Sequence, residues 1–213
     1  MAHLYPIYLN LAGKRCLVIG GGKVAERKAA TLLEYEASII LVSPESTESI
    51  KTWSAQRLID WRQRIFQPED LDGTFLVFIA TGDEDINKDI AVLCRQRGIL
   101  VNAVDDPPNC DFYVPSILRR GSLCLAISTE GKSPLLAGKL RRELETVIPD
   151  EYGEWLEILG GLRDKIKKSD LGIDERKKLF EALVYSDMLE LLREGRKEKI
   201  EERIEQCMSC LRE

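Results

Sequence analysis

The first half of the chain alternates short apolar runs with segments whose apolar residues recur at helical spacing. Four short and mostly apolar runs lie at residues 16–19, 38–43, 75–80 and 100–104. Such runs are typical of strands that are buried on both faces of a parallel sheet. The segments 24–36 and 86–97 carry the helical spacing between them. The pattern predicts an α/β fold with a Rossmann-like parallel sheet.

The pattern changes after Pro107-Pro108. Residues 112–115 and 123–128 are predicted as two more strands, separated by a basic turn at Arg119-Arg120-Gly121. Ser133-Pro134 then predicts the start of a helix that ends near Val147, because proline is favoured at the first helical position. This small strand, strand and helix block does not continue a Rossmann sheet. From Pro149 onward the apolar residues again recur at helical spacing.

We therefore predict three parts: a Rossmann-like domain at 1–113, a small α+β block at 114–149 and a helical C-terminal domain at 150–213. The formal net charge of −5 argues against a nucleic-acid partner. His3, near the N-terminus, is the one histidine of the chain, so we expect no Ser-His or Cys-His catalytic pair within the catalytic core. Cys207 and Cys210 form a CxxC without a second pair or a neighbouring histidine, so we expect no metal site.

No apolar run approaches the roughly 20 residues that span a bilayer. The N-terminus also lacks the basic and then apolar layout of a signal peptide. We therefore expect no membrane partner and a cytoplasmic location.

A glycine-rich turn follows the first predicted strand. Gly20 to Ala25 reads GGGKVA and matches the fingerprint G-x-G-x-x-G/A of dinucleotide-binding folds. Gly20 permits a tight turn, Gly22 lets backbone N–H groups approach a pyrophosphate, and Ala25 allows close packing of the helix. The alternative is a glycine turn that only connects two elements. The next strand ends at Ser43-Pro44 without an arginine for a 2′-phosphate, which favours NAD over NADP.

Four segments occur in the order seen in one protein family. They are YPIYLNLAGKRCLVIGGGKVAERKAATLL, FIATGDEDIN, VNAVDDPPNCDFYVPS and AISTEGKSPLLAGKLRRELE. With these segments the chain resembles the precorrin-2 dehydrogenase family, whose module also forms the N-terminal part of siroheme synthases. The resemblance implies NAD-dependent oxidation of precorrin-2, a tetrapyrrole with eight carboxylates, to sirohydrochlorin. It also implies a homodimer, with residues 114–149 as a dimerisation block.

The resemblance assigns Asp105 as the catalytic residue. Ligands of parallel sheets bind at the carboxyl ends of strands, and Asp105 directly follows one. If partial burial favours proton uptake, its carboxylate can act as a general base. Asp106 is the neighbouring candidate, and a turn-capping aspartate is the structural alternative. The resemblance also implies cofactor contacts at Gly20, Gly22, Lys23, Val24, Ser43, Pro44, Ala80, Thr81 and Asn102.

The carboxylates of the substrate require positively charged side chains to bind them. The candidate substrate-binding residues are Arg119, Arg120, Ser128 and Lys132. The loop 128–133 is also predicted as a backbone anion site, because small residues and a helix start expose N–H groups. The alternative is that the charged residues are ordinary surface residues, and that Asn102 is a hydrogen-bonding residue at a strand end.

Three functions fit these observations. The first is an NAD-dependent precorrin-2 dehydrogenase. The second is a bifunctional enzyme that is also a sirohydrochlorin ferrochelatase, because some members of the family insert iron. The third is a regulatory module that binds a nucleotide without chemistry.

Overall fold

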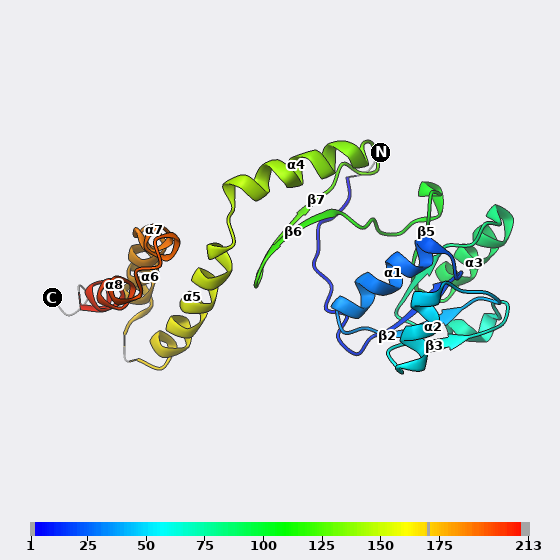
Figure 1. Ribbon diagram of the computed structural model, residues 1–213, viewed down its shortest axis with the longest axis horizontal. Helices are drawn as coiled ribbons and strands as arrows, with labels where there is room; N and C mark the ends of the chain where they lie inside the picture. The colour runs from blue at the N-terminus through cyan, green and yellow to red at the C-terminus, as the bar shows by residue number, and fades with distance from the viewer. Residues whose placement is uncertain (1–2, 170, 210–213) are drawn as a thin grey trace. The chain divides into compact units, whose positions relative to one another are not determined.

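The computed structural model describes residues 3–169 and 171–209. The chain divides into two compact units, Met1–Val114 and Pro115–Glu213, which Figure 1 shows in the blue to green and the green to red parts of its colour range. The boundary between the units lies between Val114 and Pro115, one residue after the position expected from the sequence. The further boundary expected between 149 and 150 stays a prediction.

The first unit is built on a five-stranded parallel sheet. Its strands are β1 (Arg15–Ile19), β2 (Ser38–Val42), β3 (Asp60–Arg62), β4 (Leu76–Ile79) and β5 (Leu100–Ala103). Their order in the sheet is β3-β2-β1-β4-β5, the order of a Rossmann fold. The predicted fold class is therefore confirmed. The strand β3 was not predicted, because its three residues, DWR, contain no apolar run.

Helices cover both faces of this sheet. They are α1 (Lys23–Glu34), α2 (Glu48–Ala55) and α3 (Glu84–Gln96). Ala25 and Ala29 of α1 and Ile50 of α2 share one apolar core with one face of the sheet. Ile90 and Cys94 of α3 belong to the core on the other face. Because both faces are buried, the central strands read as continuous apolar runs.

Hydrogen bonds align the residues that follow the strands. The N–H of Gly20, after β1, donates to the carbonyl oxygen of Val42 on β2 at 3.0 Å. The N–H of Ala80, after β4, donates to Ile19 at 2.8 Å, and that of Val104, after β5, donates to Ile79 at 2.9 Å. The turns after β1, β4 and β5 therefore lie along the carboxyl edge of one sheet, where ligands of such folds bind.

The second unit begins with an antiparallel hairpin of β6 (Ser116–Arg120) and β7 (Leu123–Ile127). In the described part of this unit the hairpin is followed by the helices α4 (Pro134–Val147), α5 (Glu151–Lys167), α6 (Ile173–Val184), α7 (Met188–Arg193) and α8 (Lys197–Ser209). Figure 1 shows α4 beside the hairpin, and α6, α7 and α8 gathered together. Trp155, Leu179 and Met188 lie in the apolar core that α5 to α8 enclose.

The predicted strand at 112–115 and the predicted turn at Arg119-Arg120-Gly121 are wrong. Phe112 packs edge-on against Phe78, and Pro115 has no N–H to donate to a ladder, so the strand begins only at Ser116. Arg119 and Arg120 lie in β6 and pair with Cys124 and Leu123. The turn is instead the two residues 121 and 122, where glycine adopts φ +53°.

Within residues 3–169 and 171–209, no helix combines the length and the apolar character that crossing a bilayer requires.

A buried carboxylate fastens the segment between β3 and β4. Asp70, in the short 3-10 helix Pro68–Leu71, is 1% exposed. It accepts hydrogen bonds from Arg62 at 2.8 Å, from Arg64 at 2.6 and 2.7 Å and from the N–H of Gln67 at 3.0 Å. Burial alone raises the pKa of Asp70, but the bonds from Arg64, Gln67 and Arg62 outweigh it and lower the pKa to about 2.

We expect Asp70→Asn to lower the free energy of unfolding at pH 7 by about 2 kcal/mol. The folded pKa lies below the unfolded one, so this stability is present above about pH 4 and is lost as the pH falls toward 2. Urea denaturation at pH 7 and pH 3 measures the difference, which should narrow at pH 3. The control is Asp72→Asn, because Asp72 is 73% exposed beside Arg97. A loss of stability that is equal at both pH values contradicts this account.

Candidate functional site

The three glycines after β1 have different surroundings. Gly20 adopts φ +120°, and a Cβ there would lie 2.3 Å from the carbonyl oxygen of Ala80. A Cβ at Gly21 would lie 1.9 Å from the carbonyl oxygen of Glu45. A Cβ at Gly22 would meet no atom within 4 Å among the described residues. The first two glycines thus allow close approach within the protein, whereas the third faces open space.

Gly21 was not among the predicted site residues, because the dinucleotide-binding fingerprint leaves its position variable. In the structure its carbonyl oxygen accepts a hydrogen bond from the N–H of Thr47 at 3.1 Å. The loop after β2 therefore lies directly on the glycine turn. The signal in the sequence was the glycine at this variable position, since G-x-G-x-x-G specifies glycine only at the positions of Gly20 and Gly22 in this turn.

Helix α1 begins at this open space. Gly22 is its N-cap residue, and no described side chain caps it. The first N–H groups of a helix have no partner within the helix, and they carry its partial positive charge. A pyrophosphate fits here, because Gly22 leaves room for it and the helix start supplies N–H donors. Lys23 lies beside this start, 82% exposed, and pairs with Glu26 at 3.1 Å.

The other predicted cofactor residues of the first unit lie in the neighbouring turns. The hydroxyl oxygen of Ser43 would be 2.8 Å from a Cβ at Gly21, and the exposed Pro44 follows it. Ala80 contacts Gly20 through its carbonyl group. The Thr81 hydroxyl bonds the side chain of the buried Asn87, which holds the turn after β4 against α3. Their contact with a cofactor stays a prediction.

Asp105 and Asp106 differ in their surroundings. Asp105 has φ +60° in the turn after β5, and its side chain is exposed. Asp106 accepts a hydrogen bond from the Asn109 side chain at 2.7 Å, as a turn-forming aspartate does. The structure therefore leaves Asp105 as the accessible carboxylate. Asp105 is exposed among the described residues, so the partial burial on which its role as a base depends stays a prediction.

Asn102 has a structural role on β5. It is 8% exposed, and its side-chain amide donates to the carbonyl oxygen of Phe112 at 2.9 Å. Residues 102 and 110 also form an antiparallel bridge. These contacts agree with the strand-end alternative and hold the returning segment along β5. A contact of Asn102 with the nicotinamide stays a prediction.

The predicted substrate-binding residues all lie in the second unit. Arg120 donates to the carbonyl oxygen of Ile148 at 2.9 Å and pairs with Asp150 at 3.0 Å. Its guanidinium thus joins the hairpin to the junction of α4 and α5, which favours a structural role. Arg119 is exposed on β6, and Lys132 is exposed and lies 3.8 Å from Glu130.

Oxygen atoms of the loop 128–133 accept hydrogen bonds from N–H groups of the same loop. The Ser128 hydroxyl accepts from the N–H of Glu130, and the Thr129 hydroxyl accepts from that of Ser133, each at 3.1 Å. The N–H of Lys132 donates to the Thr129 carbonyl oxygen at 2.9 Å. The predicted backbone anion site is therefore wrong for these three groups, because hydroxyl and carbonyl oxygens of the loop already satisfy them.

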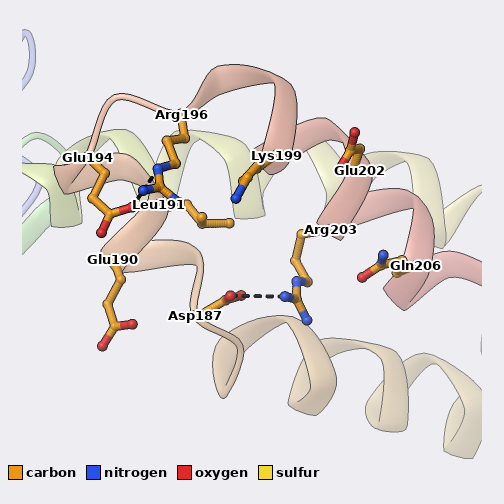
Figure 2. A pocket seen from close by; sticks show the side chains of 9 residues that line it. All are labelled: Asp187, Glu190, Leu191, Glu194, Arg196, Lys199, Glu202, Arg203 and Gln206. Carbon is orange, nitrogen blue, oxygen red and sulfur yellow. Dashed lines mark hydrogen bonds and ion pairs between the residues drawn. The ribbon is translucent and has the colours of Figure 1, made fainter.

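A cavity of about 380 Å³ lies among α7 and α8, well apart in the chain from the glycine turn. Figure 2 shows the ion pair between Asp187 and Arg203, at 2.9 Å, among the side chains that line it. Four acidic and three basic side chains face it together. Because these opposite charges lie close to one another, the cavity does not present the concentrated charge that an anionic ligand requires.

Buried thiols offer no reactive group. Burial raises the pKa of Cys16 and of Cys94 to about 11 each. Both therefore behave as apolar side chains at neutral pH. No group of three potential ligands for a metal ion occurs in the described residues, and Cys210 of the CxxC lies outside them.

Comparisons with known proteins agree with this architecture. Residues 7–116 match the model of a putative NAD(P)-binding family. Residues 120–146 match the sirohaem biosynthesis protein central region, and residues 151–208 match the sirohaem synthase dimerisation region. The predicted nicotinamide dinucleotide cofactor is confirmed at the level of this family.

The proteins with similar sequences are siroheme synthases. A siroheme synthase of Nitrosococcus oceani is 36% identical over 200 residues, which are 94% of this chain and 43% of that protein. Siroheme synthase 1 of Aeromonas salmonicida is 39% identical over 86% of this chain and 39% of that protein. The chain thus spans less than half the length of these curated relatives.

A solved structure is similar over almost the whole chain. It is that of SirC, precorrin-2 dehydrogenase, with 27% identity and a TM-score of 0.80, and the match covers 97% of this chain and 100% of that one. Together with the three family models, this similarity confirms the resemblance found in the sequence. The chain belongs to the family of precorrin-2 dehydrogenases and siroheme synthase N-terminal modules.

Proposed function

We propose that this protein oxidises precorrin-2 to sirohydrochlorin with NAD⁺ as the hydride acceptor. The observation that carries the proposal is the shared carboxyl edge of the sheet, which holds both the open helix start at Gly22 and the accessible carboxylate of Asp105. The similarity to SirC, precorrin-2 dehydrogenase, supports the substrate. The absence of an arginine at Ser43-Pro44 supports NAD over NADP.

The reaction removes two hydrogens from the macrocycle. One leaves a C–H bond as hydride and reduces NAD⁺ to NADH. The other leaves as a proton, which the carboxylate of Asp105 accepts as general base and then releases to solvent. The chain binds the cofactor through the N–H groups at the start of α1, and the turn after β5 presents the base.

We propose Asp105 rather than Asp106 as the base. A general base needs a lone pair that is free to accept a proton, and the Asp106 carboxylate already accepts from Asn109 at 2.7 Å. The carboxylate of Asp105 forms no ion pair or hydrogen bond with the other described residues. The macrocycle itself supplies the partial burial that the turn lacks, because binding a flat ligand excludes water from the carboxylate.

We also propose a homodimer that forms through the second unit. The match to a dimerisation region supports it. Helix α4 adds an exposed apolar face, with Leu135 at 80%, Leu136 at 46% and Val147 at 66% exposure. Sedimentation equilibrium should give about twice the chain mass of 24.2 kDa. A species of single chain mass at micromolar concentration contradicts the dimer. The cytoplasmic location expected from the sequence stays a prediction.

The function is tested by incubating the purified protein with precorrin-2 and NAD⁺ under anaerobic conditions. We expect the absorption spectrum of sirohydrochlorin to appear together with one NADH per macrocycle. Addition of ferrous iron to the same cuvette tests the ferrochelatase alternative, in which the sirohydrochlorin spectrum gives way to that of siroheme. No oxidation of precorrin-2, despite measurable NAD⁺ binding, favours the regulatory module instead.

A further inference from the structure

The turn that presents Asp105 belongs to a loop that leaves β5 and returns to the same strand. The loop begins after Ala103, and at its other end the N–H of Asp111 donates to the carbonyl oxygen of Val101 at 2.8 Å. The carboxylate of Asp111 in turn accepts from the N–H of Val101 at 3.2 Å. These two bonds close the loop 104–111 at its base, so the position of Asp105 depends on what holds the rest of the loop.

The backbone of Asp105 needs such support. Its φ of +60° lies in the left-handed region, which a residue other than glycine keeps only where the surrounding structure holds it there. In a loop that was free to move, this φ would relax toward a more common value. The relaxation would turn the carboxylate of Asp105 in another direction.

Arg95 of α3 joins the loop to the helix that packs beside β5 (Figure 1). Its guanidinium donates to the carbonyl oxygen of Pro108 at 2.9 Å, to the side-chain oxygen of Asn109 at 3.3 Å and to the carboxylate of Asp111 at 3.3 Å. The first two acceptors lie in the short 3-10 helix Pro107–Asn109. Because the guanidinium is planar and its donors have fixed directions, three acceptors on it hold the loop in one place.

The bond to Asn109 extends this support to the residue next to Asp105. The side-chain amide of Asn109 donates to the carboxylate of Asp106 at 2.7 Å, while its oxygen accepts from Arg95. Arg95 thereby fixes the orientation of the amide, since a reversed amide would lose both bonds. The backbone N–H of Asn109 also donates to the carbonyl oxygen of Asp106 at 3.0 Å. Asp106 is thus held through its side chain and its main chain, directly after Asp105.

We propose that Arg95 is a positioning residue for precorrin-2 oxidation, which holds the loop 104–111 on α3 so that Asp105 presents its carboxylate to the substrate. The inference rests on the proposed function, in which Asp105 accepts the proton. Arg95 acts through Asn109 and Asp106 and not by contact with the reacting atoms.

The kinetics of Arg95→Met test the proposal. The side chain of Arg95 is 39% exposed, so its replacement leaves no cavity in the core and the variant should fold. We expect kcat for precorrin-2 to fall about tenfold, because a displaced base slows proton transfer. KM for NAD⁺ should stay within about twofold of wild type, since the proposed cofactor site at the start of α1 lies outside the loop. Unchanged kcat in Arg95→Met overturns the proposal.

The matched control is Arg97→Met. Arg97 is the C-cap residue of the same helix and is 37% exposed. It donates to the carbonyl oxygen of Pro68 at 2.7 Å and to the carboxylate of Asp72 at 2.9 Å. This variant therefore loses the same kinds of bond, but to the segment between β3 and β4. We expect kcat of the wild-type value, and an equal loss of kcat in both variants overturns the positioning role.

Hydrogen exchange followed by NMR adds a readout that needs no turnover. The backbone N–H groups of Asn109 and Cys110 donate to carbonyl oxygens within the loop, at 3.0 and 3.2 Å. Their exchange should become about tenfold faster in Arg95→Met, because a loop without this support opens more often, and should stay at the wild-type rate in Arg97→Met. Unchanged exchange in Arg95→Met shows that the loop does not need Arg95 and overturns the proposal.

The path through Asn109 is tested by combining Arg95→Met with Asn109→Ala. Residues that act through one another give a combined loss of kcat that is smaller than the product of the two single losses. Single losses that multiply in the double variant contradict the path. If the wild-type protein does not oxidise precorrin-2, the proposed function fails, whereas hydrogen exchange still shows whether Arg95 holds the loop.

Discussion

Asp105→Asn is expected to lower kcat for precorrin-2 oxidation by about 10²- to 10⁴-fold, the usual contribution of a general base. Asparagine keeps the size of the side chain but does not accept a proton at neutral pH. It also tolerates the φ of +60° at this position better than alanine does, so the turn after β5 should keep its shape. Stopped-flow absorbance measures the rate, and calorimetric titration should show NAD⁺ affinity within about twofold of wild type.

Asp106→Asn is the matched control for this experiment. An asparagine at 106 still offers an oxygen to the Asn109 amide, which donates to Asp106 at 2.7 Å, so the turn should be preserved. We expect activity close to that of wild type. Retained turnover in Asp105→Asn, or its loss in Asp106→Asn alone, contradicts the assignment of the base.

Gly21→Ala is expected to destabilise the first unit by about 1–3 kcal/mol and to abolish NAD⁺ binding. The new Cβ would lie 1.9 Å from the carbonyl oxygen of Glu45, a backbone atom that cannot rotate away. The loop after β2 must then separate from the glycine turn and break the bond from the Thr47 N–H at 3.1 Å. Thermal unfolding followed by circular dichroism measures the loss.

Gly22→Asp separates cofactor binding from stability. A side chain at 22 enters open space, and aspartate is a favoured N-cap residue, so the melting temperature should stay the same or rise. NAD⁺ affinity should nevertheless fall by at least about tenfold, because the new carboxylate repels the pyrophosphate. Unchanged NAD⁺ affinity in Gly22→Asp, or unchanged stability in Gly21→Ala, argues against the roles given to these glycines.

The sequence predicted the parts of the fold whose signals are local. Buried parallel strands appear as apolar runs, and Ser133-Pro134 marks the start of α4 at the residue where it begins. The strand β3 lacked a run, because an edge strand of three residues needs few apolar contacts. The hairpin was misplaced because β6 contains two arginines, which look like a turn although they lie on a partly exposed strand.

The candidate site could be predicted only where a residue type has a single common physical role, as glycine has in a tight turn. The glycine turn follows from its spacing and from its place directly after a strand. Asp105 was assigned by the family resemblance, and its place at the carboxyl end of a strand agrees with that assignment. The close contact of Gly21 with Glu45 joins the turn after β1 to the loop after β2, and no local pattern contains it. Arg120 looked like a ligand for carboxylates, but the carbonyl oxygen of Ile148 occupies its guanidinium, a contact that no local pattern contains.

A crystal structure of the protein with NAD⁺ and sirohydrochlorin tests the central claim most directly. We predict the pyrophosphate on the N–H groups at the start of α1 beside Gly22, with the macrocycle between the nicotinamide ring and the carboxylate of Asp105. A pyrophosphate bound away from the glycine turn, or a macrocycle that leaves Asp105 facing solvent on its far side, would contradict the account.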